Sequence, residues 1–169
     1  SAWNAKYRQE GNGGWAGVIS YSAMAAAVRA GYATASTDTG HSTPGGSFAL
    51  GHPEKLIDFA WRSEHEMTVK AKSVIEKMYG SGPKLSYWNG CSTGGREGML
   101  MSQRFPDYYD GIVAGAPAMR TSFSGLADRW MAVQLNAITR AVATKLAPPP
   151  APSSSPAMPV ALQTGIVAS

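Results

Sequence analysis

The sequence predicts an α/β fold in which a mostly parallel sheet carries helices on both faces. Segments with strand character alternate with segments of helical periodicity along the chain, and such alternation is typical of parallel sheets. A second observation is the stretch Lys84–Gly95 (KLSYWNGCSTGG), in which a strand pattern runs through a glycine-rich turn into a helix pattern. With 169 residues, 44% of them hydrophobic, the chain is long enough for one domain with a core.

The first third of the chain supplies a strand, a helix and a second strand. Lys6–Glu10 has strand character and runs into the glycine-rich turn Gly11–Gly14. Tyr21–Ala30 has a helical pattern, and Gly31 suits its C-terminus because glycine adopts the left-handed backbone conformation easily. Tyr32–Thr37 again has strand character and leads into a polar loop.

The longest helix pattern runs from Pro53 to Tyr79. Proline is favoured in the first helical turn, and Gly80 ends the pattern. Its apolar residues fall on one stripe, which predicts a buried face. These residues are Leu56, Ala60, Met67, Ala71, Val74, Ile75 and Met78.

The centre of the chain carries the motif Gly-x-Ser-x-Gly around Ser92. Such a serine sits on a sharp turn between a strand and a helix, where a side chain at Gly90 or Gly94 would collide with neighbouring backbone. The motif alone is weak, but a strand pattern precedes it and the helical pattern Gly94–Phe105 follows it. We therefore interpret Ser92 as a catalytic nucleophile in a nucleophile elbow, with the N–H of Thr93 available to an oxyanion.

The remainder of the chain divides into a strand, a helix and a tail. Gly111–Gly115 reads as a buried strand, and Leu126–Leu146 is helical in pattern. The Pro/Ser/Ala-rich sequence that follows cannot bury a core. We predict a partial α/β core over residues 1–120, a helical segment over 121–146 and a flexible tail over 147–169.

Composition excludes several classes of function. The net charge of +4 is mild and the lysines and arginines are scattered, so nucleic-acid binding has little support. No apolar stretch approaches the roughly 18 residues that span a bilayer, and the first residues do not resemble a signal peptide. We expect neither a nucleic-acid nor a membrane partner.

The single cysteine, Cys91, lies beside the predicted nucleophile and excludes both an internal disulfide and a cysteine-rich zinc site. One interpretation is a small buried residue that fills space under the turn. The other is that its disulfide partner lies in sequence outside these 169 residues.

Six stretches, taken in order, resemble the tannase and feruloyl esterase family of α/β-hydrolases. The pair Cys91-Ser92 is the most distinctive element, and the resemblance covers about two thirds of the chain. The stretches are Gly11–Gly17 (GNGGWAG), Gly31–His41 (GYATASTDTGH), Pro53–Phe59 (PEKLIDF), His65–Thr68 (HEMT), Asn89–Arg96 (NGCSTGGR) and Asp110–Ala118 (DGIVAGAPA).

The resemblance implies an α/β-hydrolase-type sheet and a serine esterase mechanism. Ser92 would attack an ester carbonyl, and the oxyanion would be held by the N–H of Thr93 and by that of Gly13 or Gly14. Glycines in that turn also let the backbone approach a reacting carbonyl closely.

After Thr121 this chain no longer follows the family pattern. In the family the catalytic aspartate and histidine follow a large lid, and the histidine precedes a cysteine that is disulfide-bonded to the cysteine before the serine. No histidine follows His65 here, so the chain resembles a truncated member, incomplete on the C-terminal side. Many family members hold calcium in the lid; we expect no calcium and no cofactor here.

Two histidines in the loop after the second predicted strand are candidate substitutes for the base. His41 is the better candidate, because it follows a strand and could lie at the same edge of the sheet as Ser92. His52 is the weaker one. His65 lies within the long helix, where we expect a hydrogen-bonded or surface histidine.

Three interpretations of function stay open at this point. The first is a secreted or periplasmic serine carboxylesterase that hydrolyses small phenolic esters, such as feruloyl or galloyl esters, through an acyl-enzyme. The second is a catalytically incomplete α/β-hydrolase fragment that lacks the triad aspartate and histidine. The third is an α/β-hydrolase of other specificity, such as a peptidase or lactonase. For an incomplete sheet we also expect self-association through an exposed edge.

Overall fold

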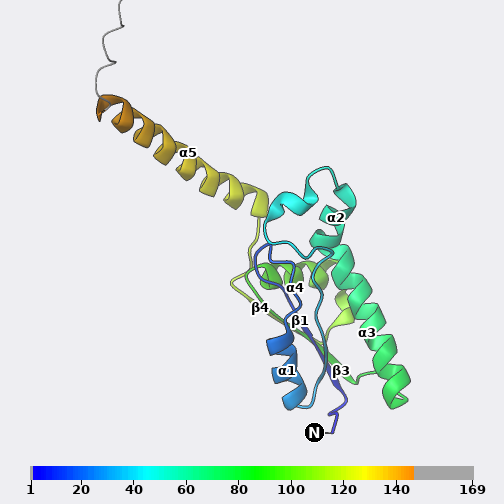
Figure 1. The fold of residues 1–169 in the computed structure, drawn as a ribbon. Coiled ribbons are helices and arrows are strands. Elements are labelled where there is room, and N and C mark those ends of the chain that lie inside the picture. The colour runs from blue at the N-terminus through cyan, green and yellow to red at the C-terminus, as the bar shows by residue number, and fades with distance from the viewer. Residues whose placement is uncertain (1, 147–169) are drawn as a thin grey trace, which may run out of the picture. The chain divides into compact units, whose positions relative to one another are not determined.

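The computed structural model describes residues 2–146 and divides the chain into two compact units, Ser1–Thr121 and Ser122–Ser169 (Figure 1). The strands are β1 (Lys6–Glu10), β2 (Ala33–Ala35), β3 (Leu85–Cys91) and β4 (Gly111–Gly115). The α-helices are α1 (Tyr21–Arg29), α2 (Pro53–Ile57), α3 (Ser63–Tyr79), α4 (Thr93–Arg104) and α5 (Thr121–Leu146). Short 3₁₀ turns span Gly46–Ala49 and Pro106–Tyr108, and a π-helix spans Asp58–Arg62.

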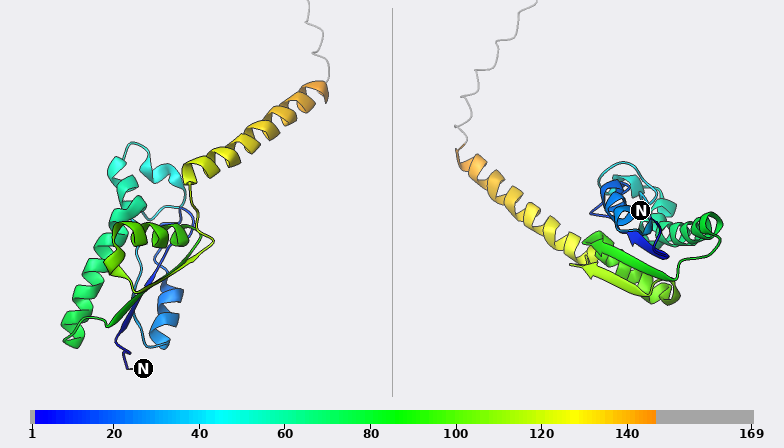
Figure 2. Two further views of the ribbon diagram at one scale, coloured as in Figure 1. Left: turned by 180° about the vertical axis from the view of Figure 1, so that it is seen from behind. Right: turned by 90° about the horizontal axis from the view of Figure 1, so that it is seen from below.

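The four strands form one parallel sheet in the order β2-β1-β3-β4. Side chains alternate between the two faces of a strand, and the helices divide accordingly. The Arg8 guanidinium reaches the Ala23 carbonyl of α1, whereas the adjacent Gln9 amide donates to Glu64 of α3 on the other face. α4 packs on β3 and β4 on the α3 side, and the view from below in Figure 2 shows α1 and α4 on opposite sides of the strands.

The core between the sheet and α4 is built around Trp88. Its indole is fully buried, and its Nε1 donates to the Gly94 carbonyl at 2.9 Å. A β-carbon at Gly98 would lie 2.6 Å from the indole Cδ1, so glycine is required for this close approach. The tryptophan therefore fixes the distance between α4 and β3, the strand that leads into Ser92.

The long predicted helix is interrupted. The structure contains α2, the π-helix and α3 in place of one helix over 53–79. The Arg96 guanidinium donates to the Phe59 and Ala60 carbonyls of the π-helix at 3.3 and 3.2 Å. A long-range contact from α4 thus supports an irregularity that local periodicity cannot predict.

The predicted burial of the long helix's apolar stripe is wrong for several residues. Ile75 is buried, but Val74 and Met78 are exposed and line an open groove of about 480 Å³ beside β2. β2 is a three-residue edge strand, and no further strand of the described part lies beyond it to cover the stripe. Elsewhere β1, β4 and the C-terminal end of α5 match the predicted bounds, although α5 begins five residues earlier than predicted.

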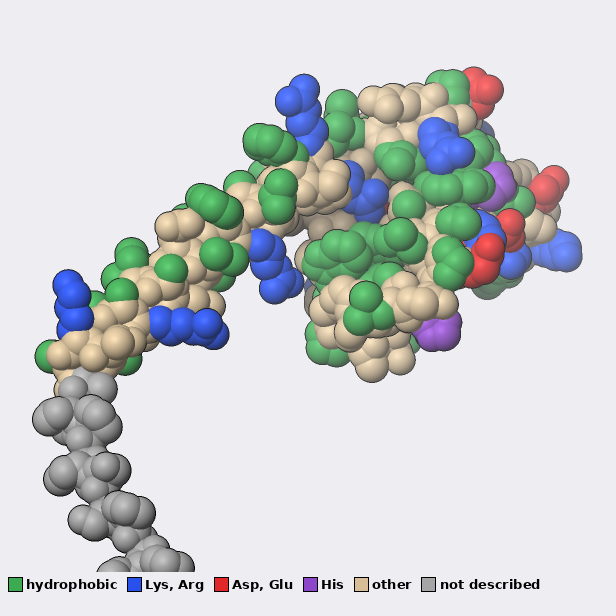
Figure 3. All heavy atoms as spheres, turned by 90° about the horizontal axis from the view of Figure 1, so that it is seen from above, with side chains coloured by type: hydrophobic (Ala, Val, Ile, Leu, Met, Phe, Trp, Pro, Cys, Tyr) green, Lys and Arg blue, Asp and Glu red, His purple; other side chains and the backbone are tan. Residues whose placement is uncertain are grey.

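α5 is the described part of the second unit. All its residues are exposed, and its apolar side chains lie between scattered Lys and Arg residues (Figure 3). Within residues 2–146, no helix has the length and apolar character needed to cross a membrane. The division of the chain at 120 and 146 stays a prediction, and the predicted tail over 147–169 lies outside the described residues.

The outer edge of β4 leads us to expect self-association of the purified chain. β4 ends the sheet and Val113 is 63% exposed, so a second chain can pair there. We expect light scattering after size exclusion to show dimers or larger species, and Val113→Lys to shift them toward monomer. The exposed helix substitution Val69→Lys is the control. A monomeric parent chain at concentrations near 100 µM would contradict this expectation.

Candidate active site

Ser92 occupies a strained bend between β3 and α4. Its backbone has φ 58° and ψ −116°, a conformation that is costly for a residue with a β-carbon. Hydrogen bonds hold the bend: its N–H donates to the Gly115 carbonyl at 2.9 Å, and its carbonyl accepts from Arg96 and Ala118 at 3.0 Å. The side chain is exposed, and its hydroxyl has no hydrogen-bond partner within residues 2–146. This is the strand–turn–helix bend that the predicted nucleophile elbow requires.

The glycines around Ser92 are required by close backbone contacts. A β-carbon at Gly90 would lie 2.4 Å from the Gly94 carbonyl oxygen, and one at Gly95 would lie 2.4 Å from the Gly115 oxygen. A β-carbon at Gly94 would lie 2.8 Å from the carbonyl oxygen of Asn12. The motif therefore reflects packing of strand, helix and loop backbone against one another.

The glycine loop after β1 contacts the start of α4. The Gly94 N–H donates to the Asn12 carbonyl at 2.7 Å, and the Thr93 hydroxyl donates to the Gly14 carbonyl at 3.1 Å. β1 and β3 are parallel neighbours, so their C-terminal ends meet at one edge of the sheet. The structure thus brings the loop with Gly13 and Gly14 against Thr93.

The backbone donors predicted for an oxyanion hole are open in this arrangement. The N–H groups of Gly13, Gly14 and Thr93 make no hydrogen bond to any residue of the described part of the chain. Thr93 is also the first residue of α4, where N–H groups have no partner inside the helix. Thr93 directly follows the serine, and the loop that carries Gly13 and Gly14 contacts Thr93 and Gly94.

Glu97 is a buried carboxyl that the sequence reasoning missed. Its Oε2 accepts the Asn12 N–H at 3.0 Å, and burial raises its pKa to about 7. A periodicity argument could have found it, because Gly94, Glu97, Gly98 and Met101 share the buried face of α4. Burial, and then the nearby Glu97, also raise the pKa of Glu64 well above its ordinary value.

His41 is buried in an aromatic cluster. Its ring stacks on Phe48 at a centroid distance of 3.7 Å, with Nδ1 at 3.4 Å from the Thr39 hydroxyl and Nε2 at 3.4 Å from the Trp15 carbonyl. Among the contacts of the described residues, none joins His41 to Ser92. The role of His41 as base stays a prediction.

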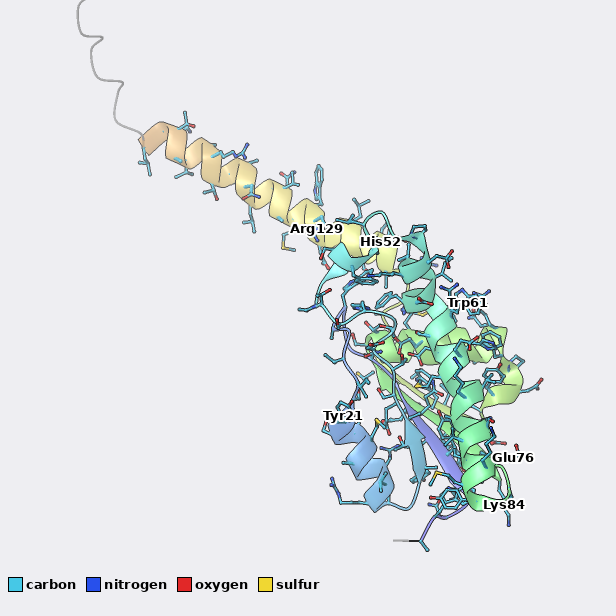
Figure 4. The ribbon with its side chains drawn as sticks, turned by 45° about the vertical axis from the view of Figure 1, so that its right-hand side comes forward. Tyr21, His52, Trp61, Glu76, Lys84 and Arg129 are labelled. Atoms are coloured by element: carbon cyan, nitrogen blue, oxygen red, sulfur yellow. The ribbon has the colours of Figure 1, made fainter. Side chains whose placement is uncertain are left out.

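The other histidines lie elsewhere. His52 is exposed at the N-terminal end of α2 (Figure 4) and lines, with His41, an open cavity of about 450 Å³. His65 is a hydrogen-bonded helix residue, as predicted: its Nδ1 lies 2.8 Å from the Tyr108 hydroxyl, and its ring stacks on Phe105. Within residues 2–146, no three His, Cys, Asp or Glu side chains are grouped to hold a metal ion.

Cys91 is an exposed thiol, so the predicted buried filler under the turn is wrong. Trp88 and Gly90 face α4, and strand alternation turns Cys91 to the opposite face. On that face α1 covers β1 and β2, whereas the helix that packs on β3, α4, lies on the other face. The thiol therefore lies open beside the elbow.

Comparison with known proteins places the chain in one protein family. The model of the family "Tannase and feruloyl esterase" matches residues 1–154. A probable feruloyl esterase B-1 of Aspergillus fumigatus is 45% identical over 119 residues, and feruloyl esterase B of Aspergillus niger is 43% identical over 117. These matches cover 70% and 69% of this chain and 22% of each relative.

Two solved structures have the same arrangement of elements. Feruloyl esterase B from Aspergillus oryzae has a TM-score of 0.68 at 42% identity, and a tannin acyl hydrolase from Aspergillus niger has 0.64 at 32%. The matches cover 70% and 72% of this chain and 24% of each solved chain. The chain therefore spans about a quarter of the length of the proteins that it matches.

The contact at Gly90 yields a prediction for stability. We expect Gly90→Ala to lower the free energy of unfolding by about 1–3 kcal/mol, since the added methyl group meets backbone that cannot move aside. Gly82→Ala, where no atom lies within 4 Å of the new methyl group, is the control. Urea denaturation measures both, and equal stability of the two variants would refute the steric explanation.

The Glu97 carboxyl yields a prediction for pH dependence. Its pKa is about 7 when folded and near 4.5 when exposed, so the folded chain holds the extra proton between these values. The free energy of unfolding therefore falls as the pH rises from about 4.5 to 7, by at most about 1.4 kcal/mol per pH unit for one proton. We expect Glu97→Gln to flatten this slope in urea titrations. The exposed α3 residue in Glu76→Gln is the control (Figure 4), and an unchanged slope in Glu97→Gln would contradict the assignment.

Proposed function

The chain belongs to the tannase and feruloyl esterase family, and we propose that it carries the nucleophile and oxyanion donors of a serine carboxylesterase. The predicted α/β-hydrolase-type fold is confirmed by the parallel sheet and by the solved relatives. Because the chain spans about a quarter of those relatives, the activity itself is part of the proposal. The observation that supports it most directly is the strained, exposed Ser92 beside unpaired N–H groups.

In the proposed reaction the Ser92 oxygen attacks the ester carbonyl carbon. The carbonyl oxygen becomes an oxyanion, which accepts hydrogen bonds from the N–H of Thr93 and from that of Gly13 or Gly14. Collapse of this intermediate releases the alcohol and leaves an acyl group on Ser92, which water then removes. Each such donor contributes roughly 10²–10³ in rate in comparable sites.

The proton of Ser92 needs an acceptor during attack. Family resemblance assigns this role to a histidine held by an aspartate, and no residue of this sequence matches them. The alternative of a catalytically incomplete fragment therefore remains open beside the esterase proposal. His41, or less readily His52, would become the base only after rearrangement of the surroundings described above.

Phenolic esters are the proposed substrate class. The relatives named feruloyl esterase B and tannin acyl hydrolase support feruloyl and galloyl esters in particular. Turnover of an amide or a lactone in preference to these esters would support the third interpretation, a hydrolase of other specificity. The proposal includes no cofactor and no nucleic-acid or membrane partner, and it follows the family resemblance in a secreted or periplasmic location.

Hydrolysis of model esters tests the proposal. We expect purified chain to hydrolyse methyl ferulate, methyl gallate or a p-nitrophenyl ester at no more than roughly 10³–10⁴ times the rate in water, because only oxyanion donors and binding act when a base is missing. The nucleophile itself is tested by mass spectrometry after incubation with the p-nitrophenyl ester: we expect an acyl adduct on the parent chain and on Ser73→Ala, an exposed serine of α3, and none on Ser92→Ala.

The outcomes separate the alternatives. An acyl adduct that survives Ser92→Ala, or its absence from the parent chain, would contradict the proposed nucleophile. Ordinary esterase rates that Ser92→Ala abolishes would instead refute the incomplete-fragment alternative and return His41 and His52 to consideration. A parallel panel of amide and lactone substrates tests the third interpretation.

A further inference from the structure

Glu97 lies at the centre of a polar contact between α4 and the glycine loop. The residue is 1% exposed, and it shares the buried face of α4 with Gly94, Gly98 and Met101. A carboxyl so placed loses its contact with water, which is unfavourable unless its oxygens are hydrogen-bonded. Its position next to the loop that carries Gly13 and Gly14 requires an explanation other than packing.

The peptide groups of Asn12 are held by α4 on both sides. The N–H of Asn12 donates to Glu97 Oε2 at 3.0 Å, and its carbonyl accepts from the Gly94 N–H at 2.7 Å. The Asn12 side chain donates to the Thr37 carbonyl at 2.9 Å. Asn12 immediately precedes Gly13, so these contacts set the direction from which the loop enters its two glycines.

The surroundings leave Glu97 with few other partners. Within residues 2–146, Glu97 Oε1 has no hydrogen bond, and the Arg96 guanidinium lies 3.8 Å away while it donates to the Phe59 and Ala60 carbonyls. From α3, the buried carboxyl of Glu64 interacts with Glu97 electrostatically. Glu64 uses one oxygen to accept from the Gln9 amide at 2.8 Å, and its other oxygen is unpaired in the same described residues.

We propose that Glu97 is a positioning residue for the oxyanion loop: its ionised carboxylate binds the Asn12 N–H and thereby orients the donors of Gly13 and Gly14. This inference rests on the proposed function, because only that function gives the loop the role of binding an oxyanion. A carboxylate accepts a hydrogen bond roughly twice as strong as that of a neutral acceptor. Protonation of Glu97 therefore loosens Asn12, and ionisation tightens it.

Because Glu97 is buried, its carboxyl ionises near neutral pH. Burial raises the pKa of Glu97 to about 7, with Asn12 and Arg96 opposing that rise. Glu64 is the buried carboxyl that faces Glu97 from α3, and the ionised Glu97 raises the pKa of Glu64 in turn; Arg96 is the cation beside Glu97 on α4. The loop is therefore held firmly above about pH 7 and less firmly below.

Two substitutions separate the charge of Glu97 from its ability to accept a hydrogen bond. Glu97→Gln keeps an acceptor oxygen and cannot ionise, whereas Glu97→Leu removes the acceptor and leaves the Asn12 N–H unpaired. Glu64→Gln keeps Glu97 and removes the other buried carboxyl that could titrate nearby. The exposed Glu76→Gln on α3 is the matched control.

The test uses NMR spectroscopy of the full chain, because an NMR measurement does not depend on catalytic activity. In the parent and in Glu76→Gln, we expect the Asn12 amide resonances to show one transition between pH 5 and 9 with a midpoint near 7. The transition should be absent in Glu97→Gln and should persist in Glu64→Gln, because burial and not Glu64 raises the pKa of Glu97. In Glu97→Leu, we expect the Asn12 amide to exchange with solvent at least about tenfold faster. A flat Asn12 response in the parent, or a transition that survives Glu97→Gln, overturns the inference.

A covalent probe links this result to the serine. A p-nitrophenyl phosphonate reacts covalently with an accessible serine hydroxyl, and we expect it to modify Ser92. At pH 8 we expect the rate of modification to be at least about tenfold lower in Glu97→Leu than in the parent. In Glu97→Gln we expect a rate within about threefold of the parent. Equal rates in the parent and Glu97→Leu would overturn the positioning role. If Ser92 is modified in none of the chains but the Asn12 transition is observed, the result would contradict the proposed function. It would still support the hydrogen bond between the Glu97 carboxylate and the Asn12 N–H.

Discussion

The bend at Ser92 is the constraint on which the rest of the first unit depends. A positive φ at a residue with a β-carbon persists only where surrounding contacts fix it. Here β4 fixes it through Gly115, α4 through Arg96, and the segment after β4 through Ala118. The absence of side chains at Gly90, Gly94 and Gly95 lets these backbones meet, so the strand order and the serine geometry support each other.

The interior beside this bend is unusually polar. Gln9 accepts hydrogen bonds from the hydroxyls of Tyr7, Thr68 and Tyr109 and donates to Glu64, all on the face of the sheet that α3 covers. Directional contacts of this kind fix orientation more strictly than apolar packing, but each unpaired oxygen among them is unfavourable for folding. A site that must aim backbone donors benefits from that strictness, which gives a physical reason for acids in a small core.

The sequence predicts features that depend on local rules and fails where distant residues decide. The elbow, β1, β4 and the parallel sheet follow from glycine spacing and alternation, which neighbouring residues set. The π-helix at Asp58–Arg62 depends on Arg96 from α4, and the exposure of Cys91 depends on which face the helices cover. The surroundings of His41 depend on Phe48 and Trp15, which only the folded loop brings to it. Glu97 was detectable from helix periodicity, but its partner Asn12 lies 85 positions away in sequence.

The bend that presents the Ser92 hydroxyl forms independently of any catalytic base. The hydrogen bonds that hold the bend at Ser92 come from backbone of β4, of α4 and of the segment after β4, and within residues 2–146 no histidine takes part. A base would change how fast the hydroxyl reacts, but it would not be needed to place that hydroxyl at the edge of the sheet. Loss of a base therefore need not disturb the elbow, whereas a side chain at Gly90 would disturb it even with every catalytic group present. In this fold the serine is positioned by the packing of glycines, and catalysis is an additional requirement placed on a geometry that already exists.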